Sequence, residues 1–132
     1  KAYAYFRTGQ NSYGSLAGGW MGTVYGETTN FATLFRVLDG SPAELFNWIS
    51  SNVSAGRPVS MGSRADTTAP IVEGHAYMVI STQTVGGQQL VTLYNPWGVD
   101  GAIWDSNAKD GLVTLTIDQL IANIYTVSVS LA

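Results

Sequence analysis

The chain has 132 residues, a formal net charge of −3 and 11% charged residues, with no cysteine and a single histidine. This length suits one compact domain, and a hydrophobic content of 45% excludes a disordered tail. The composition also excludes disulfides and thiolate metal sites, and one histidine argues against a zinc site.

The first 27 residues are expected to form an irregular lead-in, because they contain several glycines and no clean hydrophobic period. Tyr13, Trp20 and Tyr25 are expected to pack this segment onto the rest of the domain. The next apolar stretch, residues 31–38, fits either a strand or two turns of helix.

The clearest helix signal covers residues 41–55. Ser41 is a favourable N-cap, Pro42 suits the first helical position, and Glu44 completes the pattern of a capping box. Gly56 suits the end of the helix. The apolar residues of this segment recur at helical spacing and form one stripe, which consists of Leu45, Phe46, Ile49 and Val53.

Most of the remaining chain is predicted to be strand. Runs with strand character cover residues 59–62, 76–82, 90–94, 112–117 and 125–131, and a short helix is expected over residues 118–124. Gly86-Gly87, between the second and third of these runs, is a hairpin signal. The sequence therefore predicts an α+β fold, in which one main helix packs on a twisted antiparallel sheet or partial barrel.

The only histidine, His75, and Asn95 lie on the two arms of this predicted hairpin. The midpoint between them is Val85, next to Gly86-Gly87, so a turn there would place the two residues opposite each other. Directly opposed residues of an antiparallel pair share a face, with Cβ atoms about 4.5–5.5 Å apart. The asparagine carboxamide would then reach an imidazole nitrogen.

Each of these residues also has a purely structural interpretation. A lone histidine at the start of a strand is commonly structural, Asn95-Pro96 near a glycine is a turn signal, and Trp97 is an ordinary core candidate. The combination is less common, because an imidazole oriented by a side-chain carbonyl and covered by an indole is the basic half of a Cys-His-Asn site. The residues by themselves leave both interpretations open.

Two motifs carry a resemblance to a known family: "GHAYMVI", which holds His75, and "LVTLYNPWG", which holds Asn95. Together they resemble the histidine and asparagine motifs of the calpain family of papain-like cysteine proteases. The stretches "KAYA", "YGSLAGGW" and "ELFNWISSNVSAGRPVSMGS" resemble that family in the same order. The resemblance covers nearly the whole chain. Residues 1–132 are expected to form a single domain. It implies that residues 1–27 come from the end of the first catalytic lobe, that residues 28–132 form the second lobe, and that residues 31–38 are a strand.

The resemblance implies a role for four residues. His75 resembles the general base, and Asn95 resembles the partner that orients it. Trp97 resembles the indole that covers this pair and borders the substrate cleft, and Gly74 is expected to leave room for a substrate main chain. The histidine of such a site holds a cysteine thiolate as an ion pair and then protonates the leaving amine.

The chain lacks the nucleophile for this chemistry, because it contains no cysteine, and no serine lies in a recognisable nucleophile motif. In the family the cysteine lies on the first lobe, so the expected partner is a Cys-bearing first lobe, as an upstream segment or a separate chain. The resemblance thus implies half of a calpain-like cysteine endopeptidase for protein or peptide substrates, inactive alone. The alternative is a non-catalytic peptide- or glycan-binding module derived from this lobe, which contains four Trp and seven Tyr.

No cofactor is required for this chemistry, but animal calpains bind calcium in this lobe. Asp110-Gly111 matches part of the acidic motif, whereas Leu112 stands where another acid is expected. Asp100, Asp105 and Asp110 carry oxygen ligands that suit a hard cation, although a solvated turn is the simpler interpretation. We therefore expect weak or absent calcium binding.

The composition also bears on partners and location. The six basic residues are scattered, which predicts no nucleic-acid partner, and no apolar run reaches the length of about 20 residues that a membrane span needs. With so few charges, the surface must consist largely of Ser, Thr, Asn, Gln and Gly, which favours a secreted or cell-envelope protein.

Overall fold

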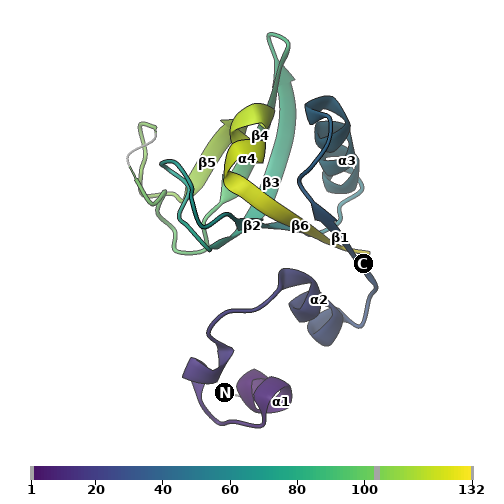
Figure 1. The fold of residues 1–132 in the computed structure, drawn as a ribbon, viewed down its shortest axis with the longest axis vertical. Coiled ribbons are helices and arrows are strands. Elements are labelled where there is room, and N and C mark those ends of the chain that lie inside the picture. Colours follow the sequence, from purple (N-terminus) through teal and green to yellow (C-terminus); the bar gives the residue numbers. More distant parts are fainter. Residues whose placement is uncertain (1, 103–104, 132) are drawn as a thin grey trace.

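A six-stranded antiparallel sheet with the strand order β1-β6-β2-β3-β4-β5 dominates the computed structural model, which describes residues 2–102 and 105–131 (Figure 1). The strands are β1 (Thr33–Val37), β2 (Val59–Ser63), β3 (Ala76–Val85), β4 (Gln88–Tyr94), β5 (Leu112–Thr116) and β6 (Ile124–Ser130). The helices are α1 (Ala2–Thr8), α2 (Met21–Thr29), α3 (Pro42–Ser54) and α4 (Ile117–Asn123), with a 3-10 turn η1 (Tyr13–Leu16). This open sheet with helices confirms the predicted α+β class, and residues 31–38 contain the strand that the resemblance implied.

The hydrophobic core lies between one face of the sheet and the helices α3 and α4. The predicted stripe of α3 points into it: Leu45, Phe46 and Ile49 are buried, and Val53 packs at its edge. The strands contribute alternate residues, as the two-residue period of a half-buried sheet requires. These strand residues are Val59, Met61, Tyr77, Val91, Leu93, Val113, Leu115, Val127 and Val129.

The helix starts differ from the predicted capping pattern. Ser41 stands at the N-cap of α3, but its side chain makes no capping hydrogen bond, so the box expected with Glu44 is absent. A complete box forms instead at α4, where Thr116 accepts from the Gln119 backbone N–H and the Gln119 side chain accepts from the Thr116 N–H. The capping hydrogen bonds therefore stabilise the shorter of these two helices.

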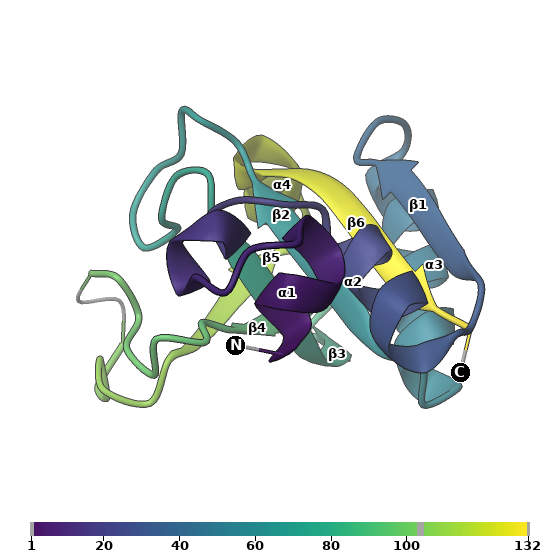
Figure 2. The same cartoon turned by 90° about the horizontal axis from the view of Figure 1, so that it is seen from below.

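The prediction of an irregular lead-in over residues 1–27 is wrong as regards secondary structure, because α1, η1 and α2 lie there (Figures 1 and 2). Of the aromatic side chains expected to pack this segment, Tyr13 is 64% and Trp20 is 58% exposed, but Trp20 meets Phe35 of β1 edge-on with 6.2 Å between ring centroids, and Tyr25 is half-buried. The low, irregular hydrophobicity of this segment obscured its short helices. The division into a first-lobe remnant and a second lobe stays a prediction.

Helix α2 packs on the sheet face opposite to the core. Gly22 lies close to β6, because a Cβ there would be 3.5 Å from the Ser128 Oγ. A Cβ at Gly62 of β2 would lie 2.9 Å from Thr126 Oγ1 and 3.3 Å from Met21 Cε. The glycines therefore permit a close approach of helix and sheet, which brings residues 19–21 to the start of β3.

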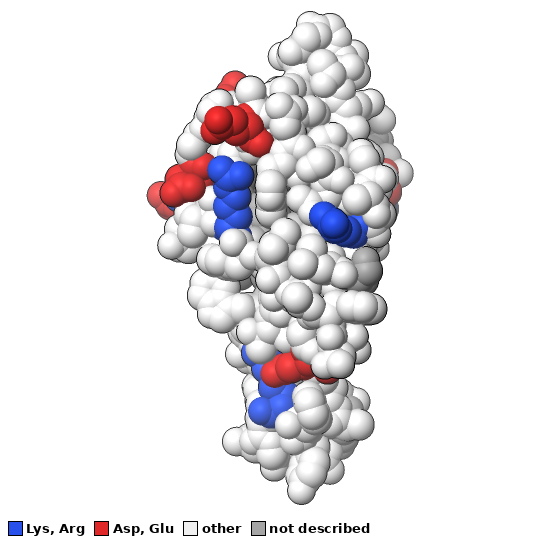
Figure 3. Space-filling view, turned by 90° about the vertical axis from the view of Figure 1, so that its right-hand side faces the viewer, with Lys and Arg blue, Asp and Glu red and all other residues white. Residues whose placement is uncertain are grey.

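Charged side chains are sparse on the face shown in Figure 3, in keeping with the low charge content of the chain. Among the residues that the structure describes, no helix is long and apolar enough to cross a membrane.

The two helix starts lead to a stability prediction. Thr116→Ala should lower the free energy of unfolding by about 1 kcal/mol, because it removes the side-chain acceptor of the capping box. Ser41→Ala is the matched control and should cost clearly less, since Ser41 makes no capping bond. Urea denaturation of both variants checks this, and equal losses would show that the two caps do not differ in solution.

Candidate active site

A one-residue shift in β3 decides how His75 and Asn95 meet. Next to the turn, β3 and β4 pair regularly, from Val85 opposite Gln88 to Ser81 opposite Thr92. The register then shifts by one residue between Ser81 and Val79. Beyond the shift, Val79 lies opposite Leu93 and Met78 lies opposite Tyr94. Continued by one step, this register sets Asn95 opposite Tyr77. His75 lies two residues before Tyr77, just ahead of β3, so the prediction that His75 and Asn95 are directly opposed is wrong.

The two residues nevertheless share a face, because diagonal neighbours two residues apart in an antiparallel pair remain within reach of longer side chains. The shift between Val79 and Ser81 makes this possible. Without it, Asn95 would stand opposite Met78 and point to the other face from His75, since side chains alternate along a strand. The predicted turn at Gly86-Gly87 is confirmed, and both glycines have positive φ.

The His75 imidazole is hydrogen-bonded to the Asn95 side chain, with 2.9 Å between Nε2 and Oδ1. The Trp97 backbone N–H donates to the same Oδ1 at 3.0 Å. Because a backbone N–H is always a donor, this second bond identifies the carboxamide oxygen as the atom facing the imidazole. In the neutral form of the imidazole, this bond makes Nε2 the nitrogen that carries the proton and leaves the lone pair on Nδ1.

Backbone hydrogen bonds fix the chain around Asn95, whose buried carboxamide nitrogen Nδ2 has no hydrogen-bond partner among the described residues. Asn95 is completely buried, its backbone N–H donates to Gly111 O at 2.8 Å, and Gly98 N–H donates to Asn95 O at 2.9 Å. The last of these bonds closes the turn at residues 95–98, in which Pro96 presets the backbone. The predicted Asn-Pro turn therefore also supplies the orienting group.

Ser63 positions the His75 backbone and was not singled out from the sequence. Its Oγ accepts the His75 N–H at 2.8 Å and donates to Val72 O at 2.6 Å, and its own N–H donates to His75 O at 2.9 Å. These bonds tie the entry of β3 to the end of β2. Only the β2–β3 register could have revealed this partner, and the sequence contains no turn signal that sets it.

Two aromatic rings contact the imidazole. Trp97 lies against it with 4.3 Å between ring centroids and a tilt of 44°, and Tyr77 meets it edge-on at 5.1 Å. Trp97 itself is 62% exposed, so it shields one side of His75 while most of its own surface stays open. Tyr77 is buried and accepts the Val72 N–H at 2.9 Å, and burial raises the pKa of its hydroxyl.

Gly74 lies in a tight turn just before His75. Its φ is +57°, a conformation that disfavours side chains, and its N–H donates to Arg64 O at 2.9 Å. A Cβ at this position would meet no atom within 4 Å. The backbone conformation thus explains the glycine, and the open space beside it is compatible with the predicted room for a substrate main chain.

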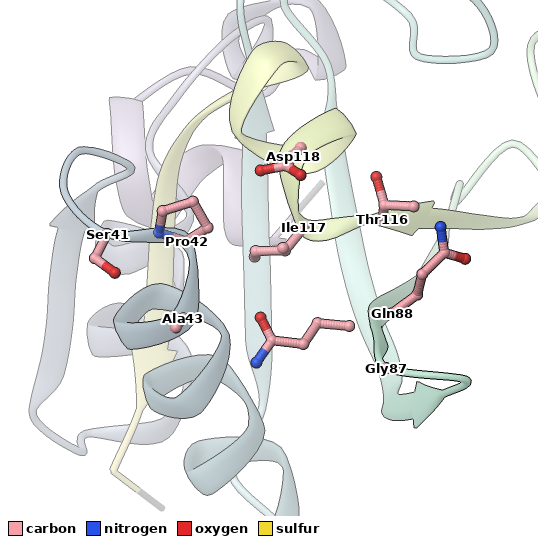
Figure 4. A pocket seen from close by; sticks show the side chains of 9 residues that line it. Ser41, Pro42, Ala43, Gly87, Gln88, Thr116, Ile117 and Asp118 are labelled. Atoms are coloured by element: carbon pink, nitrogen blue, oxygen red, sulfur yellow. The ribbon is translucent and has the colours of Figure 1, made fainter.

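Two cavities of 170 and 320 Å³ adjoin His75 and share Gly19, Met21, Gly74 and Ala76 as lining residues. The remaining wall of the 170 Å³ cavity comes mainly from β2 and β6. The remaining wall of the 320 Å³ cavity comes mainly from α1, η1 and α2. A roomier cavity of 510 Å³ lies elsewhere, between the start of α3, the start of β4 and α4 (Figure 4). It contains none of the predicted site residues, so size alone does not mark the reactive region.

The acidic loop behind the Asn95 turn contains one buried carboxylate. Asp100 is fully buried, and neither of its side-chain oxygens makes a hydrogen bond of good geometry with a described residue. Removal from solvent raises the pKa of this carboxyl, and the charges of Asp105 and Asp110 raise it further, although the nearby Gly111 backbone N–H acts to lower it. Asp105 and Asp110 accept hydrogen bonds within their own loop.

No group of three or more His, Cys, Asp or Glu residues is placed to hold a metal ion within residues 2–102 and 105–131. The expectation of weak or absent calcium binding stays a prediction, which calorimetry at millimolar calcium checks.

The arrangement can act as an oriented base. A neutral imidazole whose Nε2–H is held by Asn95 presents the Nδ1 lone pair to an acidic proton. The Ser63 hydroxyl beside it is committed to backbone bonds, and the chain contains no cysteine. Neither this hydroxyl nor a cysteine of the chain is therefore available to His75 as a nucleophile.

The family model described as calpain family cysteine protease matches residues 1–114. The matched stretch includes the N-terminal helices, α3, the β3–β4 hairpin and the whole His75–Asn95 turn region. No curated protein matches the chain.

The buried Asp100 leads to a prediction about pH. Because its pKa is raised on folding, the wild type should lose stability as pH rises from the ordinary value of 3.8 towards the raised value. Asp100→Asn removes this loss, so its free energy of unfolding relative to wild type should increase between pH 3.5 and pH 7 (on the order of 1 kcal/mol for each pKa unit).

Urea denaturation across this pH range measures the difference. Asp66→Asn, which removes an exposed aspartate, controls for the loss of one negative charge. If Asp100→Asn instead loses stability relative to wild type at higher pH, the folded chain stabilises the Asp100 carboxylate, as a bound cation would.

Proposed function

Because the chain belongs to the calpain family of cysteine proteases, we propose that it is the His/Asn half of a calpain-like cysteine endopeptidase. His75 is the general base, and Asn95 is its orienting partner. One observation carries the proposal: the Asn95 oxygen is fixed by the Trp97 N–H and bonded to His75 Nε2 at 2.9 Å.

In the proposed reaction, His75 Nδ1 takes the proton of a cysteine thiol, and the thiolate attacks the peptide carbonyl carbon. The imidazolium then returns the proton to the nitrogen of the leaving amine as the C–N bond breaks, which leaves an acyl-enzyme thioester. Water attacks this thioester with His75 again acting as base, and the thiol is regenerated. Asn95 accepts from Nε2–H throughout and so keeps Nδ1 aimed at the sulfur.

The neighbouring residues support these steps in the proposal. Trp97 covers one side of the imidazole and borders the substrate cleft, and the open space at Gly74 accommodates the substrate main chain. Ser63 keeps the His75 backbone at a constant distance from β2. Because Ser63, Asn95 and Trp97 all contact His75, its side chain loses little conformational freedom when the thiol arrives, which favours proton transfer.

The nucleophile belongs to a partner in this proposal, since this chain has no cysteine. The partner is the Cys-bearing first lobe of the protease, and the substrate is a protein or peptide. The isolated 132-residue chain is therefore inactive, and the cavities beside His75 face the space where that lobe stands.

Activity measurements test the proposal. The purified chain alone should release no product from a fluorogenic peptide or casein, whereas a two-lobe protein from its own reading frame should be active. In that protein His75→Ala should lower kcat/KM by about 100-fold or more, and Asn95→Ala should lower it less. The rate of thiol alkylation by iodoacetamide near neutral pH should fall in His75→Ala, because the thiolate loses its counter-ion.

Thr84→Ala, on the exposed part of β3 away from His75, is the control and should keep full activity. Robust turnover by the isolated chain, or an unchanged alkylation rate and kcat/KM in His75→Ala, would overturn the assignment. A reading frame without any first lobe would favour the alternative, a non-catalytic peptide- or glycan-binding module.

A further inference from the structure

The 320 Å³ cavity beside His75 has a chemical character that the catalytic assignment does not use. Most of its wall is apolar or glycine, and Arg7 is the one charged residue among those that line it. The lining residues are Tyr3, Arg7, Leu16, Gly18, Gly19, Met21, Val24, Gly74, His75 and Ala76. An arginine in the wall of a largely apolar cavity can favour a bound residue of opposite charge.

The two terminal nitrogens of the Arg7 guanidinium point toward Gly19. A Cβ at Gly19 would be 3.0 Å from both terminal nitrogens of Arg7, so a side chain there would displace the guanidinium. The absence of a side chain at Gly19 thus lets Arg7 reach the cavity. Both residues belong to the N-terminal helical segment, which faces the entry of β3.

The charge of Arg7 is only partly compensated. Its Nε lies 3.8 Å from Glu27 Oε2, which is long for an ion pair, and the same oxygen accepts a hydrogen bond of 2.6 Å from Tyr3. A guanidinium has five N–H donors, and the contacts with Glu27 and Tyr3 use only part of them. The Arg7 side chain is 21% exposed, so its remaining donors act in a partly desolvated site where they bind anions more strongly than in water.

We infer, on the basis of the proposed function, that this cavity is a specificity site for an acidic substrate residue, preferentially glutamate, and that Arg7 determines the preference. The methylenes of the glutamate contact the apolar wall at Leu16, Met21 and Val24, while its carboxylate accepts from Arg7. The substrate main chain passes the open space at Gly74, next to His75. The selected residue therefore lies close to the bond that is cleaved.

Peptide binding to this chain tests the inference without any catalytic step. The probes are N-acetyl-X-Gly amides, in which X is Glu, Gln, Leu or Lys, titrated into the 15N-labelled chain at pH 7 and low salt. The Glu peptide should bind about fivefold more tightly than the Gln peptide and shift the amides of Gly19, Gly74 and Ala76. Added salt should weaken this preference because the interaction is electrostatic.

Variants then assign the preference to one side chain. Arg7→Gln should abolish the difference between the Glu and Gln peptides, and Arg7→Lys should retain part of it. Glu27→Gln, which removes the competing charge and keeps an acceptor for Tyr3, should strengthen the preference for Glu. Arg57→Gln removes an exposed arginine outside the cavity and should change nothing.

Equal binding of the Glu, Gln and Leu peptides would overturn the inference, and so would an unchanged preference in folded Arg7→Gln. Shifts confined to residues outside the cavity, or no saturable shift with any peptide, would overturn it as well. Binding requires no thiol, so an inactive two-lobe protein with an Arg7-dependent preference would refute only the catalytic role. A hydrolytic protein without that preference would refute only the specificity site.

Discussion

The one-residue shift of β3 between Val79 and Ser81 is the constraint on which the candidate site depends. A strand alternates its side chains between two faces, so a single extra residue exchanges the faces of everything beyond it. Here the shift lies between the hairpin turn and His75, and it returns His75 to the face that Asn95 occupies. The bond between imidazole and carboxamide is thus a consequence of sheet geometry, because neither residue could reach the other across the sheet.

The chain turn at residues 95–98 depends on close backbone packing. Gly111 has a φ of +71°, and a Cβ there would lie 2.9 Å from Asn95 O and 3.1 Å from Gly98. The Gly111 carbonyl oxygen also accepts the Asn95 N–H, so the acidic loop and the turn at residues 95–98 are held together at one glycine. The buried Asp100 lies in the same loop, which places an energetically unfavourable carboxylate close to the group that orients His75. Stability and geometry of the site are therefore coupled through one short loop.

The N-terminal helices and the sheet contribute different parts of the same region. The sheet holds His75 through Ser63, and the turn after β4 holds it through Asn95 and Trp97, whereas the segment from α1 to α2 contributes the cavity wall that carries Arg7 and Gly19. This segment also carries exposed aromatic side chains, such as those of Tyr13 and Trp20. If His75 acts as the base and Arg7 selects the substrate, as proposed, the two tasks belong to different elements of the fold.

The sequence by itself determined much of this architecture. The period of α3, the Gly86-Gly87 turn and the strand runs are local signals, and each element forms within a few residues of its predicted bounds. His75, Asn95 and Trp97 were likewise identifiable, because their motifs are short and contiguous. Only the tertiary structure decided the diagonal meeting of His75 and Asn95, the support from Ser63 and the position of Arg7. These depend on a strand shift and on contacts between distant segments, which leave no periodic or local trace in the chain and follow only from how the sheet and helices pack.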